Sequence, residues 1–223
     1  MGVLNPDEKL IDYVTDYRSG TIGLLGVNDA YDLYLAQQRS GNYILVAFMK
    51  IQFFFKDDGK LSWTAFEKVD FVNQWRAAIQ QTWGGGRTIK TLKSGKSVGV
   101  DFRFQTKIGG WMLDHWELTV KKVPKGSFDV SSVNSVGGNT SLDSEDLTFA
   151  VKQRDKLTGA IYKQRGVVHE FGHMLGLDDE YESSSPHNKD YASVMNSGEV
   201  IMPRHDAVYM GWLNETLLAK KIT

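Results

Sequence analysis

Apolar and polar positions follow two different periods along the first part of the chain. Residues 43–56 form an apolar run rich in aromatic and β-branched side chains, and it ends in the turn sequence KDDG, which predicts a buried strand. In residues 62–86 the period becomes helical, and three consecutive glycines close the segment. The apolar side chains at this spacing are Phe71, Val72, Trp75, Ala78, Ile79 and Trp83. We therefore expect a long amphipathic helix, capped by Ser62 or Thr64, with its tryptophans in the core.

The middle of the chain shows strand-like alternation and then a polar stretch. Residues 87–93, 97–108 and 115–123 predict two or three strands with one polar face. Residues 124–146 are rich in Ser, Gly, Asn and Asp and indicate a long loop. Residues 147–151 predict a short edge strand.

The order of elements predicts an α+β fold. A second helix is expected over residues 158–176, followed by an irregular C-terminal subdomain. Residues 6–40 indicate one or two short helices broken by glycines, so residues 1–40 are interpreted as a helical N-terminal extension of unknown role. Residues 41–223 show no shift in composition and are expected to form one domain. We predict a mixed twisted sheet with two main helices, one backing the sheet and one carrying the site.

Composition and charge limit the classes of partner. The net charge is −1 and the pI is near 6.5, so nothing in the overall charge favours binding to nucleic acid or to an anionic membrane. The chain has no cysteine, which excludes disulfides, thiolate zinc ligands and a cysteine nucleophile. Lys50 and Gln52 interrupt the longest apolar run, so we expect no membrane span.

The N-terminal residues do not resemble a secretory signal. They include the acids Asp7, Glu8, Asp12 and Asp16 and have no apolar core segment. We therefore expect no signal peptide and synthesis in the cytoplasm. Any export would use a leaderless route or an injection apparatus.

The stretch VVHEFGHMLGLDDEY, residues 167–181, has the composition of a metal site. His169 and His173 stand four residues apart, which places both imidazoles on one face of a helix, where they can bind one zinc ion. Glu170 stands beside the first histidine and can reach a water molecule at the metal as a general base.

A catalytic zinc site needs a third protein ligand and one open position. Gly176 can end the helix and turn the chain back toward the histidines. Spacing alone leaves three acids, Asp178, Asp179 and Glu180, as candidates for the third ligand. The other histidines His115 and His187 are expected to be structural or solvated, and the acids of residues 143–146 a surface run or a helix start.

The segment HEFGHMLGLDD resembles the metzincin pattern H-E-x-x-H-x-x-G-x-x-H/D. This resemblance puts Asp179 in the third-ligand position, as in the snapalysin-like branch, and it covers about residues 167–205. It also implies a turn with a methionine beneath the metal, for which Met195 in ASVMNSG is the candidate. The implied fold and activity are those of a zinc-dependent endopeptidase with residues 41–223 as its catalytic domain. The implied cofactor is Zn²⁺.

The chain departs from astacin- and serralysin-like enzymes after the methionine. Those enzymes carry a tyrosine two residues later, whereas this chain has Ser197. His205 and Tyr209 follow and are candidates to donate to the oxyanion. His205 is also the rival of Asp179 as third ligand. In a further reading of the DEY sequence, Glu180 and Tyr181 orient the ligands.

Three hypotheses of function follow from these residues. The first is a zinc endopeptidase in which Glu170 activates water and a protein or peptide substrate pairs with an exposed sheet edge. The second is an injected effector or toxin with the same chemistry and one specific protein target. The third is a non-catalytic module in which zinc only stabilises the fold.

Overall fold

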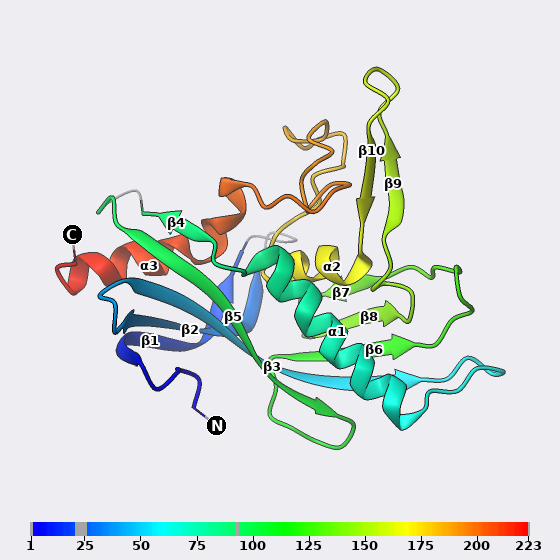
Figure 1. Ribbon diagram of the computed structural model, residues 1–223, viewed down its shortest axis with the longest axis horizontal. Helices are drawn as coiled ribbons and strands as arrows, with labels where there is room; N and C mark the ends of the chain where they lie inside the picture. The colour runs from blue at the N-terminus through cyan, green and yellow to red at the C-terminus, as the bar shows by residue number, and fades with distance from the viewer. Residues whose placement is uncertain (1, 21–25, 92–93, 223) are drawn as a thin grey trace.

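The computed structural model describes residues 2–20, 26–91 and 94–222 (Figure 1). These residues form a mixed sheet with helices packed against it, so the α+β prediction is confirmed at that level. The strands are β1 (Glu8–Ser19), β2 (Val27–Gln38), β3 (Tyr43–Lys56), β4 (Thr88–Lys90), β5 (Ser97–Ile108), β6 (Trp116–Lys121), β7 (Ser132–Asn134), β8 (Asn139–Asp143), β9 (Ala150–Arg154) and β10 (Ile161–Gln164). The helices are α1 (Ala65–Trp83), α2 (Gly166–Met174) and α3 (Ala207–Ala219), with a 3₁₀ helix at Pro203–Asp206 before α3.

The main sheet has eight strands, and its path runs β1-β2-β3-β6-β8-β7. β1, β2 and β3 pair antiparallel, whereas β3 pairs parallel with both β5 and β6. β8 pairs parallel with β6, and the short β7 pairs antiparallel with β8 at the edge of the sheet. β9 and β10 form a separate two-stranded hairpin immediately before α2.

The backing helix begins and buries its face as the sequence predicts. Thr64 is the cap: its hydroxyl accepts from the backbone N–H of Glu67 at 3.2 Å, and the Glu67 carboxylate accepts from the backbone N–H of Thr64 at 2.8 Å. The six predicted apolar side chains are all buried. α1 crosses one face of the sheet beside α2 (Figure 1). Among the described residues, no helix has the length and apolar character needed to cross a membrane.

The predicted helices in residues 6–40 are wrong, because the described part of this segment forms β1 and β2. Tyr31, Leu33 and Leu35 of β2 alternate inward and are fully buried. β1 is the edge strand, and its mixed polar sequence carries little alternation. Both strands belong to the same sheet as β3, so they extend the core rather than cover it.

Three later predictions also need correction. The expected loop over residues 124–146 contains two short, largely polar strands, β8 beside β6 and β7 at the sheet edge. The second helix begins at Gly166 rather than near residue 158, since Ile161–Gln164 pairs with β9. The edge strand expected at 147–151 is displaced to β9. The C-terminal segment is not irregular throughout, because it ends in the apolar helix α3.

Candidate metal and catalytic site

The helix α2 is fixed by aromatic packing beneath the site. Phe171 is fully buried, and its ring meets the edges or faces of four other aromatic rings at centroid distances of 5.4–6.0 Å. Trp83 also donates its indole N–H to the backbone oxygen of Val168 at 3.0 Å. The four rings around Phe171 are those of Trp75, Trp83, Phe102 and Phe104. This packing leaves the opposite side of α2, with its two histidines, facing away from the aromatic core.

The backbone carbonyls around α2 determine which nitrogen of each histidine carries the proton. Nδ1 of His169 lies 3.0 Å from the oxygen of Val194, and Nδ1 of His173 lies 2.7 Å from the oxygen of Leu177. A carbonyl only accepts hydrogen bonds, so both Nδ1 atoms must donate. In the neutral rings, Nε2 then keeps its lone pair. This is the second-sphere arrangement that presents histidine to a metal.

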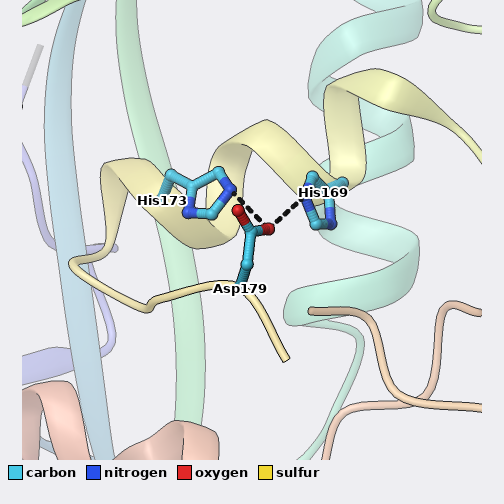
Figure 2. A group of neighbouring side chains, drawn as sticks. All are labelled: His169, His173 and Asp179. Carbon is cyan, nitrogen blue, oxygen red and sulfur yellow. Dashed lines mark hydrogen bonds and ion pairs between the residues drawn. The ribbon is translucent and has the colours of Figure 1, made fainter. Parts of the chain in front are cut away.

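The carboxylate of Asp179 meets both Nε2 atoms (Figure 2). Its Oδ1 lies 3.1 Å from Nε2 of His169 and 3.2 Å from Nε2 of His173. Burial would raise the pKa of Asp179, but the two imidazoles, which donate to its carboxylate when their Nε2 atoms are also protonated, outweigh burial and hold the pKa well below its usual value. When both Nε2 atoms are unprotonated, the ionised carboxylate and the two nitrogen lone pairs, all within 4.8 Å of one another, form a group that could hold a metal ion.

Gly176 makes the return of the chain possible. Its φ is +97°, a left-handed conformation that favours glycine, and a Cβ there would lie 2.8 Å from Cα of Gly20. The turn brings the Leu177 carbonyl to His173 and carries Asp179 back over the helix. Asp178 is exposed, so of the three candidate acids Asp179 is the one directed at the histidines.

The rival ligand His205 has the opposite hydrogen-bond polarity. Its Nδ1 accepts from the backbone N–H of Met202 at 3.1 Å, so its proton lies on Nε2 and points to Glu180 at 3.2 Å. His115 follows the same pattern, since Nδ1 accepts from the N–H of Lys50 and Nε2 faces Asp32 at 3.2 Å. Neither ring presents a nitrogen lone pair at Nε2, and His205 is not brought together with His169 and His173.

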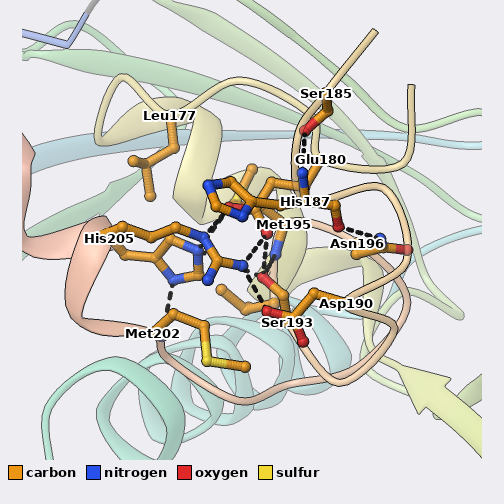
Figure 3. Close-up of polar contacts among 12 residues, drawn as sticks. Leu177, Glu180, Ser185, His187, Asp190, Ser193, Met195, Asn196, Met202 and His205 are labelled. Atoms are coloured by element: carbon orange, nitrogen blue, oxygen red, sulfur yellow. Dashed lines mark hydrogen bonds and ion pairs between the residues drawn. The ribbon is translucent and has the colours of Figure 1, made fainter. Parts of the chain in front are cut away.

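Glu180 connects the ligand segment to the loop after it (Figure 3). Its carboxylate accepts from Arg204 at 2.6 and 2.7 Å and from the Ser193 hydroxyl at 2.5 Å. Burial opposes ionisation, but Arg204, His205 and Ser193 together hold the pKa of Glu180 well below its usual value. Glu180 is thus fully engaged in positioning. His187, expected in a solvated loop, is exposed.

Met195 lies directly against the helix that carries the histidines. A Cβ added at Gly172 would collide with its sulfur, and Met195 is fully buried. The loop around Met195 is held by Gln164, whose side-chain amide donates to the oxygens of Val194 and Gly198, each at 2.7 Å. Val194 also accepts from His169. One loop therefore positions both Met195 and the imidazole ring of His169.

Glu170 opens onto a cavity of about 490 Å³ that His169 also lines. The side chain is 7% exposed, and burial raises its pKa, although the two histidines oppose the shift. The cavity is lined by residues from the loop before β7, the hairpin, α2 and the loop around Met195. Its lining includes Phe128, Val130, Ser131, Asp146, Lys152, Gln153, Gln164, His169, Glu170, Tyr181 and Ser197.

Tyr181, rather than Tyr209, places its hydroxyl at the ligands. It donates to Oδ2 of Asp179 at 2.9 Å, and its ring stacks beside His169 with centroids 6.3 Å apart. Tyr181 is half exposed and lines the cavity with Glu170. Tyr209 is buried, and its hydroxyl bonds to Asp206 and, at 2.6 Å, to Arg87. The expectation that Tyr209 or His205 donates into the site is therefore not supported by their positions.

Asp146 is a cavity residue that the sequence did not distinguish from a surface acid. It is buried, and its carboxylate accepts from the Ser131 hydroxyl at 2.6 Å and from the N–H of Asp143 at 2.8 Å. Burial raises the pKa of Asp146 to about 6, with the neighbouring charges of Asp143 and Glu170 adding to the shift. Asp143 is buried too. The surface-run interpretation of residues 143–146 is thus wrong for both aspartates.

No known protein-family model matches the chain, and a search of curated protein sequences finds no match. The geometry itself brings the Nε2 atoms of two histidines to one aspartate, with a buried glutamate and a tyrosine hydroxyl nearby. This set can bind a divalent metal and move a proton next to it.

Proposed function

We propose that this protein is a zinc-dependent endopeptidase of metzincin type. The observation that carries the proposal is the convergence of the Nε2 atoms of His169 and His173 on Asp179, with each Nδ1 held by a backbone carbonyl. These three side chains would bind the metal. Met195 beneath α2 and the turn at Gly176 support the metzincin assignment.

In this proposal each residue at the cavity has one task. Zinc bound by the three ligands supplies Lewis acidity, which acidifies water and polarises a carbonyl. Glu170 accepts the proton of the attacking water on its carboxylate and delivers it to the nitrogen of the leaving amine. Its burial supports this task, because a carboxylate with a raised pKa accepts a proton more readily at neutral pH.

Tyr181 takes the donor role that the sequence assigned to His205 or Tyr209. Its hydroxyl is half exposed at the cavity and bonds to Oδ2 of Asp179, so a small rotation would redirect it to the oxyanion of a substrate. The substrate backbone would pair with the sheet edge at β7, because the residues just before this strand, 128–131, line the cavity.

The decisive experiment separates metal binding from proton transfer. Glu170→Gln is expected to keep one zinc per chain by metal analysis and to cleave casein or a peptide library about 10²–10⁴-fold more slowly. Glu215→Gln, on the exposed side of α3, is the matched control and should leave both values unchanged. Cleavage by Glu170→Gln at the wild-type rate would exclude the mechanism.

The ligand assignment is tested in the same assay. Asp179→Ala should weaken zinc binding by more than about 100-fold, since even changes to groups that orient metal ligands cost 10–100-fold. Asp178→Ala, at the exposed neighbour, should retain zinc. Loss of zinc in His205→Gln together with its retention in Asp179→Ala would move the third ligand to His205.

The non-catalytic alternative is less well supported by the donor set. Structural zinc sites use four protein ligands, whereas the group of His169, His173 and Asp179 contains three. A buried Glu170 facing a cavity also has no task in a purely structural site. The injected effector remains a hypothesis about target range, which depends on surfaces outside the metal site.

A further inference from the structure

The hairpin formed by β9 and β10 stands apart from the main sheet. It projects outward from the body of the protein, just before the chain enters α2 (Figure 1). At its base, Lys152, Gln153 and Gln164 line the same cavity as Glu170. The ring of Tyr162 lies tilted against that of Tyr191, with centroids 5.7 Å apart. The hairpin is therefore a wall of the cavity that continues into solvent.

The projecting part of the hairpin carries unneutralised positive charge. Residues 150–164 contain four cationic side chains and one acid, Asp155, although the whole chain has a net charge of −1. Asp155 accepts from the backbone N–H of Leu157 at 2.8 Å and so belongs to the turn. Arg154, Lys156 and Lys163 are exposed, and none of them forms an ion pair or side-chain hydrogen bond with a residue that the structure describes.

The outward face of the hairpin places apolar side chains among these charges. Ile161 and Lys163 stand two residues apart on β10 and so share one face; Arg154 pairs with Ile161, and a register shift in the hairpin sets Val151 opposite Lys163. Ile161 and Val151 are each about half exposed, and Leu157 at the tip is 97% exposed. Cations interleaved with aliphatic side chains match a polypeptide that alternates acidic and apolar residues. Nucleic acid would instead need aromatic platforms on this face.

The position of the hairpin favours a protein over a membrane as its partner. The cavity that the hairpin helps to line also exposes the apolar side chains of Phe128 and Val130. A polypeptide can extend from the hairpin to the surface that Phe128 and Val130 expose. A bilayer would be contacted at the tip, where Leu157 is accompanied by the polar Asp155 and Thr158.

We infer that the β9–β10 hairpin is a docking arm for an acidic, apolar segment of a protein substrate. This inference rests on the proposed peptidase function, because it assigns the arm to the selection of substrates for that site. The arm would hold a segment next to the scissile bond, and it would favour intact acidic proteins over short neutral peptides.

The test uses the full chain and casein, an acidic protein, as the probe. The triple variant R154E/K156E/K163E should reduce the binding of fluorescent casein to a Glu170→Gln background by about tenfold, because attraction becomes repulsion. In the catalytically intact background, kcat/KM for casein should fall by a similar factor. Cleavage of short neutral peptides should change less than twofold, since these three residues lie outside the cavity lining.

Three controls make the outcome specific. The charge-matched variant K9E/R39E/K60E, at exposed cations far along the sequence from the hairpin, should bind casein as the wild type does. Casein whose carboxyl groups are amidated should bind the wild type no better than it binds the triple variant. L157S should weaken casein binding without changing charge, which tests the apolar part of the surface.

Two results would overturn the docking arm. One is equal binding of casein by the triple variant and the wild type. The other is hairpin-dependent binding to vesicles containing phosphatidylglycerol but not to casein, which would assign the arm to a membrane. If casein binds through the hairpin but neither casein nor peptide is cleaved, the peptidase proposal fails while the binding surface stands.

Discussion

At the scale of single residues, hydrogen-bond polarity distinguishes histidines that the sequence cannot rank. The spacing of His169 and His173 predicts one shared face, and the structure agrees with that spacing. The choice between Asp179 and His205 depends on partners far away in sequence, such as the Val194 carbonyl that faces Nδ1 of His169 and the Glu180 carboxylate that faces Nε2 of His205. Such partners are set by tertiary turns, so no local pattern could have predicted them.

Tyr181 and Tyr209 should respond differently to loss of their hydroxyls. Tyr181→Phe is expected to retain zinc and to lower kcat about 100-fold, as removal of an oxyanion donor does. Tyr209→Phe should leave kcat nearly unchanged and destabilise the fold by about 1–3 kcal/mol, because Arg87 and Asp206 lose a buried partner. Kinetic assays measure kcat of both variants, and thermal unfolding measures their stability. A larger loss of kcat in Tyr209→Phe would return the donor role to Tyr209.

Asp146 should make stability fall as the pH rises. Its pKa is about 6 in the folded protein against a usual value of 3.8, so between these values the folded state holds a proton that the unfolded state has lost. The stability present below pH 3.8 is therefore lost as the pH rises through 6, by about 3 kcal/mol at most. Relative to Asp146→Asn, the wild type should lose unfolding free energy in denaturant titrations over this window. Parallel pH profiles would contradict the shift.

At the scale of elements, long periodic segments were predictable and short or edge segments were not. β3, β5 and α1 have many side chains in a regular period, and their predicted and observed bounds nearly coincide. β7, β8 and β10 are only three to five residues long, so each shows too few alternating positions to be recognised by its period. Their pairing partners, rather than their own sequences, make them strands.

The contact between α2 and the loop around Met195 depends on the missing side chain of Gly172. Gly172→Ala gains about 1 kcal/mol of helix propensity but forces Met195 aside, so a net destabilisation of about 1–3 kcal/mol is expected. Gly211→Ala in α3 is the matched control: a Cβ there has no neighbour within 4 Å, so this variant should be more stable than the wild type. Denaturant unfolding compares the two, and equal gains would show that the contact tolerates a methyl group.

At the scale of the whole molecule, the first two strands are part of the frame that supports the site. Ser19 at the end of β1 donates to the oxygen of Leu175 at 2.6 Å, where α2 ends. Tyr31 of β2 donates to the oxygen of Val208 in α3 at 3.1 Å. The sequence did not predict this role, because both contacts join segments near opposite ends of the chain. These two hydrogen bonds therefore tie β1 to the end of α2 and β2 to α3.

The backbone contact between Gly20 and Gly176 has an evolutionary consequence. A side chain at Gly20 would collide with the Gly176 carbonyl, and one at Gly176 would meet Gly20 and Ser19. Both positions therefore have to remain glycine for this contact to persist, although only Gly176 belongs to the motif that contains the two histidines. A recombination event that exchanged the N-terminal strands for a homologous segment lacking this glycine would damage the turn before Asp179 while leaving every ligand unchanged.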